Sequence, residues 1–451
     1  MHIRRRLDDG ESPAPLTTAV SEPLPAEPTG PVVSPSMLGR TFAALALPRF
    51  RNLWLGMLFS MGAMQMEIVA RSWLAYELSG SAFTLGLVAL ARSMPQIILS
   101  PLAGVAADRF DRKKLLIASQ LVMLVLSFAT AILVQLGVIQ VWHLFALGLA
   151  QGLAFPFTMP TRTAFMSDLV ERKNMANALA LDSTGRNLNL IVAPSIAGIL
   201  LAFSPMLAFY ASAILYGFAV LTLFKLPSGS RGGAGQSGAF TEMAIGFRYI
   251  WNQRILFALM LMGAVPILLG MPFQQLLPVF QADVLNVGES ALGFMFAAVG
   301  VGALAGSLGA AYFAGSQHMV KIQLACGVFF GLALVAFAMS PVYVLSLACL
   351  VVVGITSQTY LTINRSLLMM NTDPKLFGRV TSVQIMAWYF MPVSLLPMGL
   401  IADQVGVSLT VACAGLLVAI LIGGAAYRFP ELFLRASASS TVVASSPGRT
   451  S

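Results

Sequence analysis

Residues 115–161 read LLIASQLVMLVLSFATAILVQLGVIQVWHLFALGLAQGLAFPFTMPT, a run that contains no Asp, Glu, Lys or Arg. A helix needs about 20 apolar residues to cross roughly 30 Å of hydrocarbon, so this run is long enough for two membrane spans around a turn. Other charge-free stretches follow the same pattern: 187–224 and 322–364 are long enough for two spans each, and 255–282, 290–320, 380–402 and 404–427 for one each. Residues 52–107 carry Glu67, Arg71, Glu77 and Arg92 but are otherwise apolar, and the turn at Glu77–Ser81 divides them into two spans. The sequence therefore predicts an all-α membrane protein with twelve transmembrane helices.

The distribution of basic residues predicts the orientation of these spans. Hydrophobic residues make up 57% of the chain and charged residues 10%, with a formal net charge of +9. Short loops rich in Lys and Arg stay on the cytoplasmic side of a membrane. If both termini are cytoplasmic, the loops on the other side contain no Lys or Arg, near 78–81, 137–141, 203–205, 282–288, 339–341 and 403–407. We expect a multi-pass protein of the cytoplasmic (inner) membrane, in which the net charge reports topology and not nucleic-acid binding.

Polar stretches divide the chain into five parts. Ser228–Gly238 is rich in Gly and Ser and is typical of a flexible linker. After it, Phe240 to Arg254 interleaves apolar and charged residues at helical spacing, which indicates an amphipathic helix at the inner membrane surface. We expect a disordered cytoplasmic tail at 1–46 without a signal peptide, an N-terminal six-helix bundle at 47–226, a cytoplasmic linker with an amphipathic helix at 227–254, a C-terminal six-helix bundle at 255–430 and a disordered tail at 431–451.

The loop between the expected second and third spans carries a spaced motif. It reads Gly104-Val-Ala-Ala-Asp108-Arg109-Phe110-Asp111-Arg112-Lys113-Lys114. The string resembles the signature of major facilitator superfamily carriers at this place, Gly-x-x-x-Asp-Arg/Lys-x-Gly-Arg-Arg/Lys, with Asp111 in place of the usual Gly. The resemblance implies the major facilitator fold, two six-helix bundles with a substrate site near the midplane between them.

The same resemblance implies a set of gating residues, Gly104, Asp108, Arg109, Arg112 and Arg379. Gly104 would let two helices approach closely. Asp108 would face the positive N-terminal end of the eleventh span, near Arg379. The two loop arginines would add charge-assisted bonds that hold the cytoplasmic side closed. The alternative is an ordinary positively charged inner loop.

Within the superfamily, residues from about 45 to 430 resemble the exporter branch that includes the enterobactin exporter and the macrolide efflux proteins. Four strings carry the likeness: Phe50–Trp54, Leu99–Gly104, Met159–Phe165 and Phe377–Ser382. The chain departs from the superfamily's drug/proton antiporters in two places. Those carriers have an Arg three residues before a Gln-Gly pair in span four, where this chain has Gly148, and a Gly-Pro in span five, where it has Ala193-Pro194.

Five charged residues fall inside the expected spans, where each charge is costly and calls for a partner or a function. Glu67 and Arg71 lie four residues apart on one helical face, as do Asp182 and Arg186, while Arg92 has no acid in its own helix. One interpretation is purely structural: neutralised pairs, with Arg71 extending outward to the membrane surface, Asp182 near the inner surface and Arg92 facing Glu67. The other assigns proton coupling to Glu67, Arg92, Asp182 and Arg186, with Glu67 as the group that titrates, so that protonation and substrate binding compete.

The second half offers neutral polar and aromatic side chains instead of charges. Together with Arg71 they form the predicted substrate-binding set, Gln274, Gln275, Gln358, Tyr360, Gln384, Trp388 and Tyr389, although interhelical packing would explain any one of them. The buried charges of the first half leave one surplus arginine, which favours an anionic or zwitterionic substrate.

These features predict a secondary active transporter that exports a small amphipathic molecule, such as a siderophore, antibiotic or metabolite, by proton-coupled alternating access. An uptake carrier of the same fold and a non-transporting membrane sensor remain alternatives. The sequence has no clustered metal ligands and no phosphate-binding Gly-x-x-x-x-Gly-Lys motif, and its three cysteines lie within spans, so we expect no enzyme, ATP-driven pump, disulfide or metal site. We expect a monomer in the lipid bilayer that acts on a small-molecule substrate, with no cofactor and no nucleic-acid partner.

Overall fold

A computed structural model of the chain describes residues 43–171, 174–228, 239–313, 316, 318–373 and 376–428. Its described residues include twelve helices long and apolar enough to cross a membrane, which confirms the predicted number of spans. The first six are formed by α2 (Pro48–Ser79), α3 (Ala82–Arg109), α4 (Arg112–Gln135), α5 with α6 (Val141–Ala154 and Thr158–Leu169), α7 (Met175–Phe203) and α8 (Pro205–Phe224). The last six are formed by a segment that begins with α10 (Arg254–Val265), then α12 (Glu289–Tyr312), α13 (Met319–Ala338), α14 (Tyr343–Met370), α15 (Phe377–Val405) and α16 (Val407–Arg428).

The predicted five-part division remains a proposal, because most of both tails and the linker residues 229–238 lie outside the described residues. Two parts of it are described. Ala43–Ala46 form a short 3-10 turn inside the predicted tail, and the backbone N–H of Ala44 donates to Asn177 Oδ1 at 3.0 Å. In the predicted linker a helix, α9 (Ala239–Asn252), packs through Gly246 against the backbone of Arg379 at the start of α15 and exposes Phe247 and Trp251.

Short polar signals separate the spans from one another. Gly80 ends α2 in the left-handed conformation, with φ of 59°, which favours glycine because it has no Cβ. Ser81 then begins α3 by accepting a hydrogen bond from the backbone of Thr84. In the motif loop, Asp111 caps α4 in the same way through the backbone N–H of Lys114.

Proline residues interrupt two spans that the sequence analysis treated as continuous. Pro156 lies in a 3-10 turn, Phe155–Phe157, between α5 and α6. The seventh span changes its type of helix several times between α10 and its end at Val284. A π-helical turn at Pro266–Gly270 is followed by a 3-10 stretch at Met271–Leu276, by α11 (Leu277–Val279) and by a second π-helical turn at Phe280–Val284. Proline has no backbone N–H and its ring collides with the preceding turn, so Pro266, Pro272 and Pro278 prevent a regular helix.

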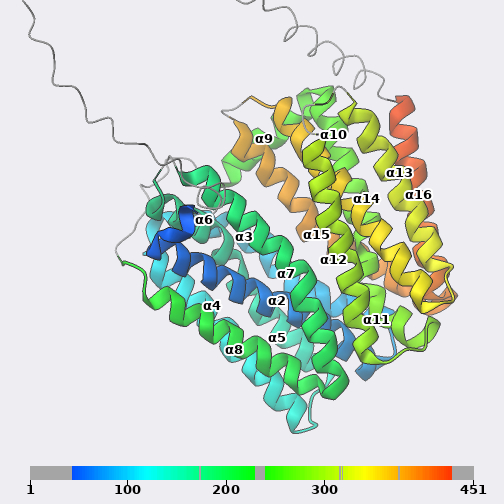
Figure 1. The fold of residues 1–451 in the computed structure, drawn as a ribbon, viewed down its shortest axis with the longest axis horizontal. Helices are drawn as coiled ribbons and strands as arrows, with labels where there is room; N and C mark the ends of the chain where they lie inside the picture. The colour runs from blue at the N-terminus through cyan, green and yellow to red at the C-terminus, as the bar shows by residue number, and fades with distance from the viewer. Residues whose placement is uncertain are drawn as a thin grey trace, which may run out of the picture. The chain divides into compact units, whose positions relative to one another are not determined.

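The spans group into two six-helix halves that meet along two pairs of helices, α3 with α15 and α7 with α12 (Figure 1). These two helix pairs form the seams between the halves. At both seams, glycines let the facing helices approach each other closely. A Cβ added to Gly198 of α7 would lie 2.2 Å from Gly293 Cα of α12, and one added to Gly399 of α15 would lie 2.6 Å from the backbone oxygen of Ala82 in α3. Small residues let helices pack backbone to backbone in a membrane, where packing is the main attraction between them.

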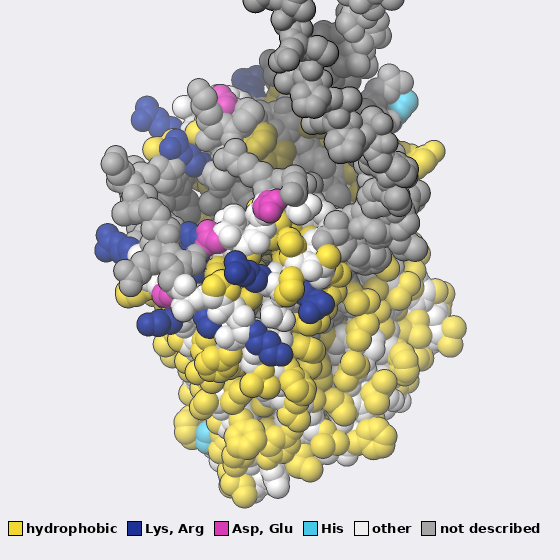
Figure 2. Space-filling view, turned by 60° about the vertical axis from the view of Figure 1, so that its left-hand side comes forward, with side chains coloured by type: hydrophobic (Ala, Val, Ile, Leu, Met, Phe, Trp, Pro, Cys, Tyr) yellow, Lys and Arg dark blue, Asp and Glu magenta, His cyan; other side chains and the backbone are white. Residues whose placement is uncertain are grey.

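The bundle has two chemically different ends. The basic end contains Arg109–Lys114, where α3 passes to α4, together with α9. The acidic end contains Ser79–Ser81, Asp283 and Asp403. Figure 2 shows Lys and Arg side chains gathered at one end above a broad hydrophobic surface, the arrangement expected of a protein embedded in lipid.

Candidate substrate and coupling site

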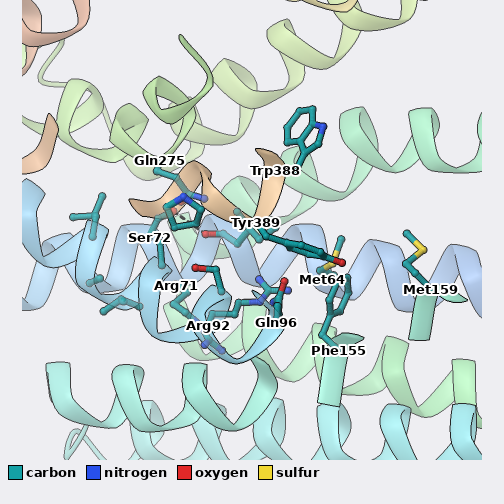
Figure 3. Close-up of a pocket in the computed structure, with 17 residues that line it drawn as sticks. Met64, Arg71, Ser72, Arg92, Gln96, Phe155, Met159, Gln275, Trp388 and Tyr389 are labelled. Atoms are coloured by element: carbon teal, nitrogen blue, oxygen red, sulfur yellow. Dashed lines mark hydrogen bonds between the residues drawn. The ribbon is translucent and has the colours of Figure 1, made fainter. Parts of the chain in front are cut away.

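A cavity of about 420 Å³ lies between the two halves, within the size range of small-molecule sites. Residues from both halves line it: Met64, Ile68, Arg71, Ser72, Ala75, Leu85, Val88, Ala89, Arg92, Ser93, Gln96, Phe155, Met159, Gln275, Trp388, Tyr389 and Pro392. Figure 3 shows Arg71, Arg92 and Gln96 on one side of the cavity and Gln275 and Trp388 on the other. Most of the wall is apolar, and the two halves contribute different chemistry to it.

Helix α2 presents one face to the cavity through residues spaced three or four apart, Met64, Ile68, Arg71 and Ala75. Arg71 lies on this face and is only 5% exposed. The expectation that its side chain reaches outward to the membrane surface is therefore wrong. The residue opposite is Gly148 of α5, where an added Cβ would lie 3.1 Å from Arg71 Nη1, so a glycine at this position leaves room for the guanidinium group.

Glu67 lies one turn before Arg71, outside the set of cavity-lining residues, and is 1% exposed. Its carboxylate accepts hydrogen bonds from Gln151 Nε2 of α5 at 3.0 and 3.2 Å. Among the described residues no ion pair joins Glu67 to Arg71 or to Arg92, so both expected pairings are wrong at contact distance. Spacing of four places two side chains on one helical face, but here a neighbouring helix supplies the closer partner.

Arg92 of α3 extends toward the 3-10 turn between α5 and α6. Its guanidinium carbon lies 5.7 Å from the ring centroid of Phe155, a distance that permits a cation–π contact. Gly152 of α5 makes this approach possible, because a Cβ there would lie 2.2 Å from the backbone oxygen of Arg92. The break at Pro156 thus brings an aromatic ring beside a half-buried cation.

The second half contributes three of the predicted substrate-binding side chains, Gln275, Trp388 and Tyr389. Four others are not among the described residues that line the cavity: Gln274, Gln358, Tyr360 and Gln384. Tyr360 is fully buried, and its hydroxyl donates to the backbone oxygen of Met262 at 2.9 Å, so it joins α14 to α10. Gln358 donates to Thr362 within its own helix.

Several members of the site were not predicted from the sequence, namely Met64, Ser72, Gln96, Gln151, Phe155 and Met159. Gln96 and Gln151 are polar side chains in otherwise apolar runs, which is a signal that could have selected them. Phe155 and Met159 flank proline positions whose local break directs them toward the cavity. Methionine and phenylalanine are common in membrane spans, so their identity alone carries no such signal.

Asp182 and Arg186 form the expected pair, with Arg186 Nη1 2.5 Å from Asp182 Oδ2. Arg162 of α6, which the sequence analysis did not select, lies 3.6 Å from the other carboxylate oxygen. None of the three is among the described residues that line the cavity. They connect α6 to α7 toward the basic end, and their predicted role in proton coupling is untested.

The predicted gating residues lie at the basic end. The side chains of Gly104 and Asp108 lie outside the described residues. Arg112 is buried and pairs with Asp168 of α6 in its own half, while its Nη1 also donates to the backbone oxygen of Ala164 at 3.1 Å. Arg109 is exposed at the end of α3. These Arg112 contacts stabilise the first half and do not bridge to the second.

Among the described residues, side-chain hydrogen bonds join the halves at the acidic end. The carboxylate of Asp403, at the end of α15, accepts hydrogen bonds from the first turn of α3: Ser81 Oγ at 2.6 Å, Ala82 N at 2.6 Å and Phe83 N at 3.1 Å. The hydroxyl of Tyr76 in α2 donates to Asp283 at 2.5 Å. A carboxylate at a helix N-terminus is favoured by the unpaired N–H groups and the helix dipole. These bonds join the two halves at the acidic end in this structure.

Within the described part of the chain, no group of three or more His, Cys, Asp and Glu side chains could hold a metal ion. Twelve apolar helices in two halves, with a partly polar cavity between them, define a membrane transporter of small molecules. A family model described as transmembrane secretion effector matches residues 39–446. The chain belongs to this family of major facilitator transporters.

Curated relatives and a solved structure agree with this assignment. The chain is 24% identical to macrolide efflux protein A of Streptococcus pyogenes, over 80% of this chain and 91% of that protein. It is 26% identical to the multidrug efflux pump Tap of Mycolicibacterium fortuitum, over 81% and 92%, and 24% identical to the enterobactin exporter EntS of Escherichia coli, over 76% and 80%. The crystal structure of the nucleoside transporter NupG has the same fold, with a TM-score of 0.67 at 15% identity, covering 85% of this chain and 98% of NupG.

Proposed function

We propose that the protein exports a small amphipathic molecule by alternating access, in exchange for protons, as a monomer in the cytoplasmic membrane. The basic end and both termini would face the cytoplasm, because positively charged loops remain on that side. The names of three relatives, a macrolide efflux protein, a multidrug efflux pump and the enterobactin exporter, support the outward direction.

One observation carries the coupling proposal: a buried carboxylate, Glu67, lies directly behind the cavity wall. Its charge is held by Gln151, and Arg71 is one helical turn away on the wall itself. Protonating Glu67 removes the negative charge beside Arg71 and weakens the bonds from Gln151. The cavity wall then differs between the protonated and ionised carrier, so proton binding and substrate binding influence each other, as linkage requires.

The contact pattern supports alternating access. At the acidic end, Asp403 and Asp283 accept hydrogen bonds that join the two halves. A carrier of this fold exposes its central site to one side at a time as the halves rock against each other. In the proposed cycle, the bonds at the acidic end must break for release to the outside.

The experiment compares Glu67→Gln with the wild-type protein in proteoliposomes. Its substrate is the compound that a deletion strain retains relative to the wild type, identified by comparing their secreted metabolites and drug tolerance. Gln has nearly the shape of Glu but cannot titrate, so we expect loss of proton-driven accumulation with counterflow exchange preserved. Glu77→Gln, an exposed carboxylate near the end of the same helix, serves as the control and should transport normally. Normal accumulation by Glu67→Gln would exclude Glu67 as the coupling group.

A further inference from the structure

The charge of the cavity wall is positive and has no counterpart among its lining residues. Of the described residues that line the cavity, two are charged, and both are arginines, Arg71 and Arg92. Glu67 lies behind the wall and is engaged by Gln151. At formal charges Glu67 offsets one guanidinium group and leaves one positive charge. A charge inside a membrane is costly unless it meets an opposite charge, which implies a partner that the described residues do not supply.

Arg71 is the clearest case of a charged side chain without a partner among the described residues. All three of its side-chain nitrogens are buried and none has a hydrogen-bond partner among the described residues. An arginine offers five N–H donors and stays charged, so unpaired burial of the whole group is strongly unfavourable. The guanidinium group is nevertheless part of the cavity lining, where a bound molecule could reach it.

Arg92, on the same side of the cavity, also has an unpaired hydrogen-bond donor. Its Nε is buried without a partner among the described residues, and Phe155 contacts its guanidinium group through the ring face and offers no hydrogen-bond acceptor. Figure 3 shows Arg71 and Arg92 close together, with Gln96 beside them. Unpaired donors of two arginines, all three nitrogens of Arg71 and Nε of Arg92, therefore lie on one wall. Arginine commonly binds carboxylate or phosphate oxygens through such donors.

We propose that the cavity binds an organic anion, whose negatively charged group lies against Arg71 and Arg92. The apolar body of this ligand would contact Phe155, Met159 and Tyr389, which line the same space. A single negative charge would neutralise the formal charge of the three groups together, Glu67, Arg71 and Arg92. This inference deepens the proposed transport function and rests on it, since the cavity is the same site. It assigns the site to anionic amphiphiles and excludes lipophilic cations.

The test uses three probes of the same shape and different charge: 2-naphthoate, 2-naphthamide and 2-naphthylmethylammonium. Binding to the purified full-length protein in lipid nanodiscs is measured by titration calorimetry without any ion gradient. We expect the wild-type protein to bind naphthoate at least tenfold more tightly than the amide, and the ammonium compound more weakly than either. Equal affinities, a preference for the cation, or no measurable binding of naphthoate would overturn the proposal.

Variants then locate the anion. Arg71→Gln and Arg92→Gln should each lower naphthoate affinity at least tenfold and change amide affinity less than twofold, while Arg71→Lys and Arg92→Lys should lose less. Arg248→Gln, an exposed arginine of α9, removes the same charge outside the cavity and should bind all three probes like the wild type. Amide binding and elution as a single species show whether each variant is folded. If both glutamine variants fold and still prefer naphthoate as the wild type does, the anion does not bind here.

The binding experiment and the transport experiment can fail separately. Charge selectivity of binding requires no proton gradient and no transport. If naphthoate selectivity depends on both arginines but Glu67→Gln still accumulates substrate, the anion site stands and proton coupling through Glu67 fails. If Glu67→Gln abolishes accumulation but the protein binds the amide and the acid equally, coupling stands and the anion site fails.

Discussion

Tyr360 illustrates a polar aromatic residue whose role is structural. Its ring packs against α13 at Gly327, where an added Cβ would lie 2.6 Å from Tyr360 Cε2. Its hydroxyl donates a hydrogen bond to the backbone oxygen of Met262. We expect Tyr360→Phe to remove one buried hydrogen bond and lower stability by about 0.5–1.5 kcal/mol. The melting temperature followed by tryptophan fluorescence in detergent should fall, while the KM for substrate stays unchanged. Tyr389→Phe, at the cavity, is the comparison, and a KM that rises only for Tyr360→Phe would contradict this assignment.

Individual buried charges were predicted from the sequence more securely than their partners. The cost of a charge in a span identified Glu67, Arg71 and Arg92 as functional or paired, and two of the three line the cavity. The bond from Gln151 to Glu67 depends on how α5 packs against α2, which spacing within one helix cannot reveal. Asp182 and Arg186 were paired correctly because both partners lie on the same helix, one turn apart.

The contact between α3 and α5 depends on one missing side chain at Gly152. A methyl group there would meet the Arg92 backbone oxygen at 2.2 Å, and backbone cannot move aside as a flexible side chain can. We expect Gly152→Ala to push the helices apart and cost about 1–3 kcal/mol, the usual penalty of overpacking. Unfolding of purified protein by heat or denaturant would measure it, together with loss of substrate binding as Arg92 shifts.

Gly309→Ala provides the matched control for this contact. Gly309 lies in α12, and a Cβ added there meets nothing within 4 Å. Alanine leaves the unfolded chain less conformational freedom than glycine does, and it fits a helix without strain. This variant should therefore be as stable as the wild type or more stable by up to about 1 kcal/mol. If both glycine variants had the same stability, close packing of α3 against α5 would not depend on Gly152.

At the level of elements, the sequence predicted the number of spans but not their internal breaks. Apolar length is a property of each segment alone, so it can be read without knowing the neighbours. The geometry at Pro156 and along Pro266–Val284 depends on which surrounding helices accommodate the freed backbone groups. Those breaks matter for function, because the turn at Pro156 orients Phe155 and the irregular seventh span carries Gln275 into the cavity.

At the level of the whole molecule, the two seams between the halves could not be predicted from apolar length or charge. The family resemblance implied two bundles with a site between them, and the structure adds which helices meet, α3 with α15 and α7 with α12. Several glycines at these seams, such as Gly198 and Gly399, resemble ordinary membrane-helix glycines in the sequence. Their role becomes visible only when the facing helix is known.

The Asp403 contact predicts how the balance between the two carrier states can be shifted. Its carboxylate caps α3 across the seam between the halves. We expect this cap to be lost when the acidic end opens. Replacing an N-cap residue with Ala typically costs about 1 kcal/mol, which changes a two-state equilibrium about fivefold. We therefore expect Asp403→Ala to favour the state open at the acidic end.

Thiol labelling in intact cells measures this shift. The reporter is Ser72→Cys at the cavity, in a background where Cys326, Cys349 and Cys413 are replaced by Ala, and the reagent is a membrane-impermeant methanethiosulfonate. Asp403→Ala should raise the labelling rate about fivefold, because the cavity opens to the outside more often. Glu289→Ala removes another carboxylate near the acidic end, in the first turn of α12, and should leave the rate unchanged. An unchanged or slower rate in Asp403→Ala would mean that this cap does not hold the acidic end closed.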